Sequence, residues 1–235
     1  ITGGPFLKSS LESGADYVVH SAHKTLPAMT MGSYLHVGKH VDDFGKVESL
    51  LRMLQSSSPS YPILASLDAA RYFAANLTEA DLSYTQSAIK QFREKLNHIE
   101  GITVLEHKAL DILKITLQAD RTFTGYQLQA ELKRHGIYTE LADPLNVLLV
   151  MPILKVGQVN NIDLPVQAIE QAVSRLKEEA EPKEPMLVHP QPERISMLET
   201  PLDELDRRES EYIDINVATG RVSAETLIPY PPGIP

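Results

Sequence analysis

The sequence predicts a mixed α/β fold with two folded parts joined by a long helix. Near the start, Gly14 precedes a β-branched and aromatic run that ends at Val19, which is typical of a short buried strand. From Thr78 onward, apolar residues recur three, four or seven positions apart, which predicts an amphipathic helix. Strands and helices then alternate as far as Glu179, and this order indicates a small α+β domain with helices on one face of its sheet.

A polar segment follows the first strand. Residues 20–24 read His-Ser-Ala-His-Lys, and they come just past the carboxyl end of that strand, where ligands collect in open α/β sheets. A second apolar run covers residues 31–37, and helical spacing covers residues 47–54. Beyond it, we expect Ser58 to cap a helix that begins at Pro59, because a proline there lacks only an N–H that would have no partner anyway.

The long helix that begins near Thr78 carries one apolar stripe and stops at Gly101. The stripe consists of Leu82, Ile89, Phe92, Leu96 and Ile99. After it we expect strands at 102–105, 112–117, 139–141 and 147–151 and helices at 125–135 and 165–179. We therefore divide the chain into residues 1–76, the end of a large domain; 77–101, a connecting helix; 102–180, the small α+β domain; and 181–235, a C-terminal subdomain after a charged, proline-broken linker.

Composition excludes several classes of function. The 235 residues are 43% hydrophobic, which allows a substantial core, and the formal net charge of -9 argues against binding to nucleic acid or an anionic membrane. We expect no membrane span and no secretory signal. The absence of cysteine excludes disulfides and favours a cytoplasmic location. Because the chain opens without methionine and stops within a proline-rich run, we expect it to be a piece of a longer protein.

Lys24 is the residue with the clearest chemical potential. Alone it would be read as a solvated surface lysine, but Ser21 and His23 offer donors beside it, and small polar positions at residues 25–33 could complete a phosphate-holding loop. A lysine amine forms a Schiff base with a carbonyl cofactor only after losing its proton. Desolvation and neighbouring positive charge both encourage that loss.

Three segments of the chain, in order, resemble the bacterial ornithine/lysine/arginine decarboxylase family. Residues 14–16 and 21–28, with Gly32 and His36, resemble the region around the family's pyridoxal phosphate (PLP) lysine. Residues 57–62, followed by Ala65 and Ser66, are similar to its Ser-Pro-x-Tyr segment, and residues 220–224 with 229–235 are similar to its C-terminal signature. The three segments span nearly the whole chain.

This resemblance implies a fold-type-I PLP enzyme related to aspartate aminotransferase, with residues 1–76 as the end of its PLP-dependent transferase-like large domain. Lys24 would form the Schiff base, and Ser21 and His23 would bind or flank the cofactor phosphate. Ser56 and Ser57 would reach the phosphate in the neighbouring subunit's site. The implied assembly is a homodimer or larger homo-oligomer with a shared active site, with no nucleic-acid or membrane partner.

The implied reaction is decarboxylation of a basic amino acid, arginine, lysine or ornithine, to an amine and CO2, a step of amino-acid metabolism and polyamine biosynthesis. Two alternatives stay open: another fold-type-I PLP reaction, such as transamination or aldol cleavage, and a non-catalytic binding or regulatory relative. The family carries an Asp-x-x-His motif that would precede this chain, and no aspartate stands before Gly14. We therefore expect the chain alone to be inactive or nearly so.

Two further patterns favour ordinary structural roles. His20, His36 and His40 suggest a metal site, but no carboxylate or thiol is clearly placed to complete one, so we expect no metal. The acidic residues in 203–211 could attract a basic amino acid. With Arg207 and Arg208 among them, a solvated helix face is the better interpretation.

Overall fold

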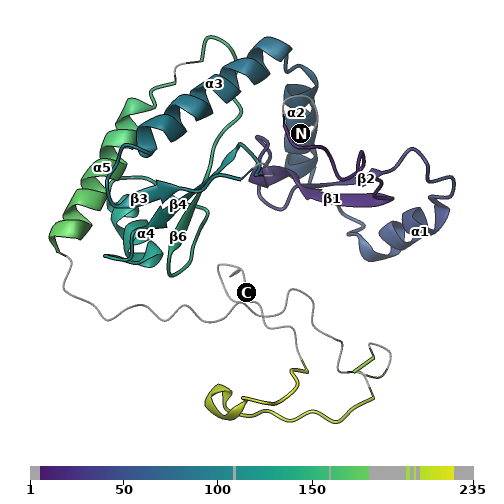
Figure 1. Cartoon of the computed structure of the whole chain (residues 1–235). Coiled ribbons are helices and arrows are strands. Elements are labelled where there is room, and N and C mark those ends of the chain that lie inside the picture. The colour runs from purple at the N-terminus through teal and green to yellow at the C-terminus, as the bar shows by residue number, and fades with distance from the viewer. Residues whose placement is uncertain are drawn as a thin grey trace. The chain divides into compact units, whose positions relative to one another are not determined.

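The computed structural model describes residues 6–107, 110–158, 160–179, 200, 201, 204 and 207–224. Contacts divide the chain into two units, Ile1–Glu181 and Pro182–Pro235. All the helices and strands labelled in Figure 1 belong to the first unit. The C-terminal signature at 229–235 and most of the expected linker lie outside the described residues.

A two-stranded antiparallel hairpin opens the described chain. Strand β1 (Tyr17–Ser21) pairs with β2 (Ser33–Val37), from Tyr17 opposite Val37 to Ser21 opposite Ser33. The expected first strand therefore exists, but it begins later than predicted. The expectation that it is buried is wrong for the described chain, because Val19 is 72% exposed. In the described sheets β1 pairs only with β2, and so short a hairpin buries neither of its faces.

Two helices follow the hairpin. The predicted helix over 47–54 is confirmed as α1 (Gly45–Leu54), and α2 covers Tyr61–Ala75. The prediction that Ser58 caps a helix starting at Pro59 is wrong: α2 has Ser60 at its N-cap position, with no side-chain cap hydrogen bond. The backbone N–H of Ser58 instead donates to Ser56 Oγ over 3.2 Å, so a local turn occupies the serine cluster and delays the helix.

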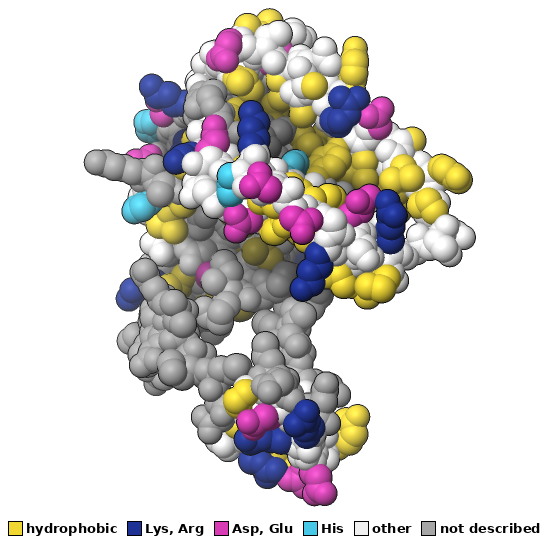
Figure 2. Space-filling model, turned by 90° about the vertical axis from the view of Figure 1, so that its right-hand side faces the viewer, with side chains coloured by type: hydrophobic (Ala, Val, Ile, Leu, Met, Phe, Trp, Pro, Cys, Tyr) yellow, Lys and Arg dark blue, Asp and Glu magenta, His cyan; other side chains and the backbone are white. Residues whose placement is uncertain are grey.

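Hydrophobic side chains remain exposed on this part of the molecule. Figure 2, which views it from the side of β1, β2 and α1 in Figure 1, shows them gathered between charged residues. The exposed apolar residues of this region include Val19, Met29, Met31, Leu50, Met53, Leu54, Tyr61, Leu64 and Tyr72. Helix α1 has no buried residue at all.

The long helix exists as α3 (Glu79–Leu96), but it ends at Leu96, with Asn97 as its C-cap, and not at Gly101 as predicted. It begins with a capping box, in which Thr78 Oγ1 accepts from the N–H of Asp81 while the Asp81 carboxylate accepts from the N–H of Thr78. Ile89, Phe92 and Leu96 of the predicted stripe are buried, so the helix packs with the face that its periodicity indicated.

The second part of this unit is a four-stranded antiparallel sheet packed against helices (Figure 1). Its strands are β3 (Ile102–Val104), β4 (Lys114–Ala119), β5 (Leu141–Ala142) and β6 (Asn146–Val150), in the spatial order β3-β4-β6-β5. Helices α4 (Gly125–Arg134) and α5 (Asp163–Glu178) join α3 in covering it. Along β4, Ile115, Leu117 and Ala119 are buried and alternate with partly exposed residues. One face of the sheet therefore forms the core, as predicted.

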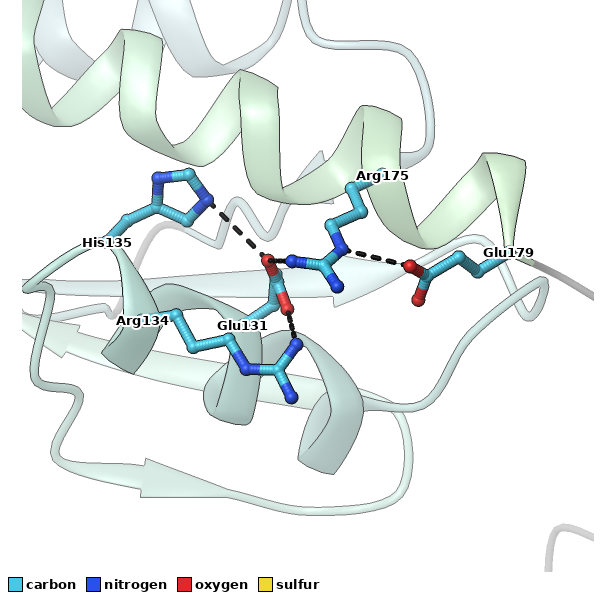
Figure 3. Close-up of polar contacts among 5 residues, drawn as sticks. All are labelled: Glu131, Arg134, His135, Arg175 and Glu179. Atoms are coloured by element: carbon cyan, nitrogen blue, oxygen red, sulfur yellow. Dashed lines mark hydrogen bonds and ion pairs between the residues drawn. The ribbon is translucent and has the colours of Figure 1, made fainter.

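A buried carboxylate joins α4 to α5. The side chain of Glu131 is 4% exposed. It pairs with Arg134 over 2.8 Å and with Arg175 over 3.2 Å, and His135 lies 3.6 Å away (Figure 3). Arg175 also reaches Glu179 over 3.0 Å, and hydrogen bonding to Glu179 is the main cause that raises the pKa of Arg175. The two helices are thus connected by a charged network as well as by apolar packing.

The second unit contributes few described residues. Its short 3-10 helix, Ile215–Val217, follows Asp214, whose side chain accepts from the N–H of Asn216. In the predicted acidic run, Asp203 and Asp206 lie outside the described residues, while Glu204 pairs with Arg208 and Glu211 with Arg221 at exposed positions. Over the whole described chain, no helix has the length and hydropathy needed to cross a membrane.

Candidate functional site

Lys24 ends the short 3-10 helix Ala22–Lys24, which follows β1 directly. The N–H of Ala22 donates to the Gly32 carbonyl over 2.9 Å, and His23 Nδ1 lies 3.1 Å from the same oxygen. Ala22 is buried, so this residue of the turn packs against the protein. The Lys24 side chain points outward and is 57% exposed.

Residues of β2 and α2, together with Gly32, contact the loop that carries Lys24. A methyl group at Gly32 would lie 3.0 Å from both Leu67 Cδ2 and the carbonyl oxygen of Met29, so alanine there would require the Leu67 side chain and the Met29 carbonyl to shift by a few tenths of an ångström. The Ser66 hydroxyl accepts from the N–H of Met29 over 3.1 Å, and the Tyr34 hydroxyl donates to the carbonyl of Leu67. The loop that carries Lys24 is therefore braced by side chains from two elements.

The contact between His23 and Gly32 restricts the chemistry of the imidazole. A carbonyl oxygen can only accept, so Nδ1 must carry the proton of this hydrogen bond. A neutral His23 then has a bare Nε2, which can accept but cannot donate. His23 could donate Nε2–H to a phosphate oxygen only as an imidazolium.

Lys24 forms an ion pair that the sequence did not suggest. Its Nζ donates to Glu140 Oε1 over 2.7 Å, across 116 residues of chain. The Glu140 side chain is 35% exposed and lies next to the start of β5. Sequence reasoning missed Glu140, because a lone acidic residue before a strand carries no pattern that links it to Lys24.

Ser21, His23 and Lys24 share one short segment, whereas Ser56 and Ser57 lie in the connection between α1 and α2. Both of these serines are exposed. Ser56 Oγ hydrogen-bonds within its own turn, donating to the Ser58 carbonyl over 3.2 Å. The assignment of Ser56 and Ser57 to a phosphate site stays a prediction.

The histidines near the site engage other groups. The rings of His20 and His36 meet edge to face with centroids 4.9 Å apart, and burial, followed by the charge of His36, lowers the pKa of His20. His40 Nε2 lies 2.7 Å from Asp16 Oδ1. Within the described residues, no group of three or more histidine or acidic side chains is arranged to hold a metal ion.

A cavity of about 740 Å³ lies elsewhere, along α3. Arg93 stands in its wall, donating to the carbonyl of Leu105, and Lys90 and Asp111 also line it. None of the predicted site residues contributes to this lining.

Comparison with known proteins gives two family matches. Residues 3–127 match the model described as "Orn/Lys/Arg decarboxylase, major domain", and residues 184–235 match "Orn/Lys/Arg decarboxylase, C-terminal domain". A protein of Bacillus subtilis, named "Uncharacterized protein YaaO", is 40% identical over 100% of this chain and 49% of its own length. An arginine decarboxylase of the same organism is 31% identical over 97% of this chain and 48% of its own length. The chain thus spans about half the length of the curated relatives it matches.

A solved structure agrees with the fold. The constitutive lysine decarboxylase of Escherichia coli superposes with a TM-score of 0.52 and 19% identity, over 69% of this chain and 28% of that one. At this identity the likeness shows the fold alone, and it confirms the expected α/β class.

Proposed function

This chain belongs to the Orn/Lys/Arg decarboxylase family, and from that premise we propose that Lys24 attaches PLP in an enzyme that decarboxylates a basic amino acid. The observation that carries the proposal is the placement of Lys24. It ends a braced turn directly after β1, with its side chain outward, inside the segment that matches the family's major domain. Arginine, lysine and ornithine are the candidate substrates.

The donor set around Lys24 suits PLP. A lysine amine is the group that reacts with the cofactor aldehyde. Ser21 adds a hydroxyl from the end of β1, and no cap hydrogen bond engages it. His23 adds an imidazole that becomes a second donor when it is protonated. Bound in this way, PLP would supply the electron sink for cleavage at Cα.

Each of the proposed site residues would have a defined role. Lys24 would hold the cofactor through its amine. Ser21 and His23 would bind or flank its phosphate. Ser56 and Ser57 are proposed to reach the phosphate of a second copy, which makes the working unit a homodimer or a larger assembly.

Several finer assignments belong to the same proposal. The protein would act in the cytoplasm, in amino-acid metabolism leading to polyamines. Residues 1–76 would complete the PLP-binding large domain, 77–101 would connect it to the small domain at 102–180, and 181–235 would form the last subdomain. The described residues offer no metal cluster, and the proposed chemistry needs none. We expect residues 1–235 alone to show little or no turnover.

The test uses the intact protein with PLP and each basic amino acid in turn, measuring CO2 and amine. We expect one substrate to release both products, Lys24→Ala to reduce release to background, and Lys39→Ala, which removes an exposed lysine just after β2, to leave it unchanged. Borohydride reduction should fix PLP to Lys24 and to no residue in Lys24→Ala. A reduced adduct in Lys24→Ala would refute the assignment.

The same measurement separates the two alternatives. A keto acid or an aldol-cleavage product without CO2 would indicate another fold-type-I reaction, since the lysine alone does not decide which Cα bond breaks. Bound PLP or amino acid without any product would indicate a binding or regulatory relative.

A further inference from the structure

We propose that Glu140 is a positioning residue that holds the Lys24 ammonium in the cofactor-free protein and thereby slows the attachment of PLP. The inference rests on the proposed function of Lys24. Glu140 lies outside the polar segment at residues 20–24, and its ion pair joins the turn after β1 to the residue just before β5.

The ion pair has the geometry of a charge-assisted hydrogen bond. Lys24 Nζ lies 2.7 Å from Glu140 Oε1, within the range of such bonds. The side chains are 57% and 35% exposed, so both are partly withdrawn from water without being buried. The contact therefore restrains the amine but can be broken at low cost.

The backbone around Glu140 is held in place. The N–H of Glu140 donates to the carbonyl of Leu148 in β6 over 2.9 Å, and Gln129 on α4 donates to the Thr139 hydroxyl over 2.7 Å. Gly136, with φ +77, turns the chain sharply after α4 and sets this course. The backbone that carries the carboxylate is thus bonded to the sheet through Leu148 and, next to it, to α4 through Gln129.

The chemistry of attachment explains why this pair matters. An ammonium has no lone pair, so Lys24 must first give one proton to solvent. The neutral amine then adds to the aldehyde carbon, and its two remaining N–H protons leave with the carbonyl oxygen as one molecule of water. A carboxylate at 2.7 Å holds the ammonium in a charge-assisted hydrogen bond, and that bond must break before the amine can react. Its negative charge also opposes the approach of the cofactor phosphate.

The expected effect is modest. Partly exposed ion pairs contribute up to about 1 kcal/mol, which corresponds to about a fivefold change in an equilibrium or a rate. Removing the charge of Glu140 should therefore speed attachment by about threefold to fivefold, and high salt should reduce the difference by screening the pair.

The test compares cofactor-free intact wild-type protein with Glu140→Gln, following the visible absorbance of the Lys24–PLP imine after PLP is mixed in at fixed pH. Glu140→Asp keeps the charge, and Glu100→Gln breaks a similar lysine pair elsewhere, where Lys177 Nζ lies 3.1 Å from Glu100. We expect faster attachment in Glu140→Gln alone. An unchanged or slower rate in Glu140→Gln, or equal acceleration in Glu140→Asp, would overturn the inference.

A second readout does not use PLP. Competitive labelling of the cofactor-free protein with acetic anhydride reports how readily Lys24 reacts relative to Lys39 in the same sample. We expect the relative reactivity of Lys24 to rise about threefold to fivefold in Glu140→Gln, and equal reactivity would overturn the inference. If labelling responds but PLP never attaches in wild-type protein, the proposed function has failed while the role of Glu140 toward Lys24 stands.

Discussion

The charged network between α4 and α5 makes a quantitative prediction. Substituting Glu131→Gln keeps the volume of a side chain that is 4% exposed but removes its charge. The amide that replaces the carboxylate retains one carbonyl oxygen, which can accept from either arginine but not from both with the strength of a carboxylate. Arg134 and Arg175 are 63% and 50% exposed, so each can turn to water when its partner is lost.

The magnitude follows from two opposing effects. Each hydrogen bond to a charged group contributes about 1.5–3 kcal/mol, and Glu131 makes one such bond to each arginine. Against this, the neutral amide avoids a desolvation cost of several kcal/mol that the buried carboxylate carries. Because the arginines rehydrate, we expect a net loss of about 1–2 kcal/mol, or about 2–8 °C in the melting temperature of a unit of this size.

The assay is amide hydrogen exchange of the intact protein, resolved for α4 and α5, together with denaturant unfolding. Glu94→Gln on α3 is the control, because its pair with Lys90 is long, 3.8 Å, and exposed. We expect faster exchange in α4 and α5 only in Glu131→Gln. Unchanged or slower exchange in that variant would refute the reasoning, because it would mean that desolvation outweighs both hydrogen bonds.

Two further predictions concern the same unit. A methyl group at Gly125 would overlap the carbonyl oxygens of Asp143 and Asn146, so Gly125→Ala should destabilise the fold by about 3 kcal/mol or more in denaturant unfolding, whereas Gly45→Ala at the start of α1 should cost little; equal stability would contradict the close approach. The pKa of Asp81 is lowered from its ordinary 3.8, first by the backbone N–H of Thr78 and then by that of Val156. Because the folded-state pKa is the lower one, this stabilisation is present above the unfolded-state pKa and is lost as pH falls through the folded one. Unfolding measured from about pH 6 to about pH 3 should therefore depend less on pH in Asp81→Asn than in wild type.

The elements that the sequence predicted best are those with long periodic patterns. Helix α3 follows its apolar stripe because the same residues that repeat in sequence fill the core, and Thr78 and Asp81 close its first turn. The strand β1 was predicted to begin too early in the sequence and to be buried, whereas it begins at Tyr17 and is largely exposed. A β-branched run indicates a strand but does not say what covers it, and the described chain provides only β2 as a pairing partner. The start of α2 was missed because Ser56 engages the N–H of Ser58.

The candidate site likewise combines residues that the sequence indicates with contacts that only the fold reveals. Ser21, His23 and Lys24 could be proposed together from the sequence because they are neighbours in one short turn after a strand; their roles stay a prediction. Gly32 was part of the motif, but the structural reason for a glycine there appears only in the fold. Its carbonyl accepts from the N–H of Ala22, and Leu67 of α2 packs against it. Glu140 acts on Lys24 through charge across 116 residues. Such a pair leaves no spacing in the sequence, so a residue that would control the reactivity of Lys24 is visible only from the fold that brings β5 to the end of β1.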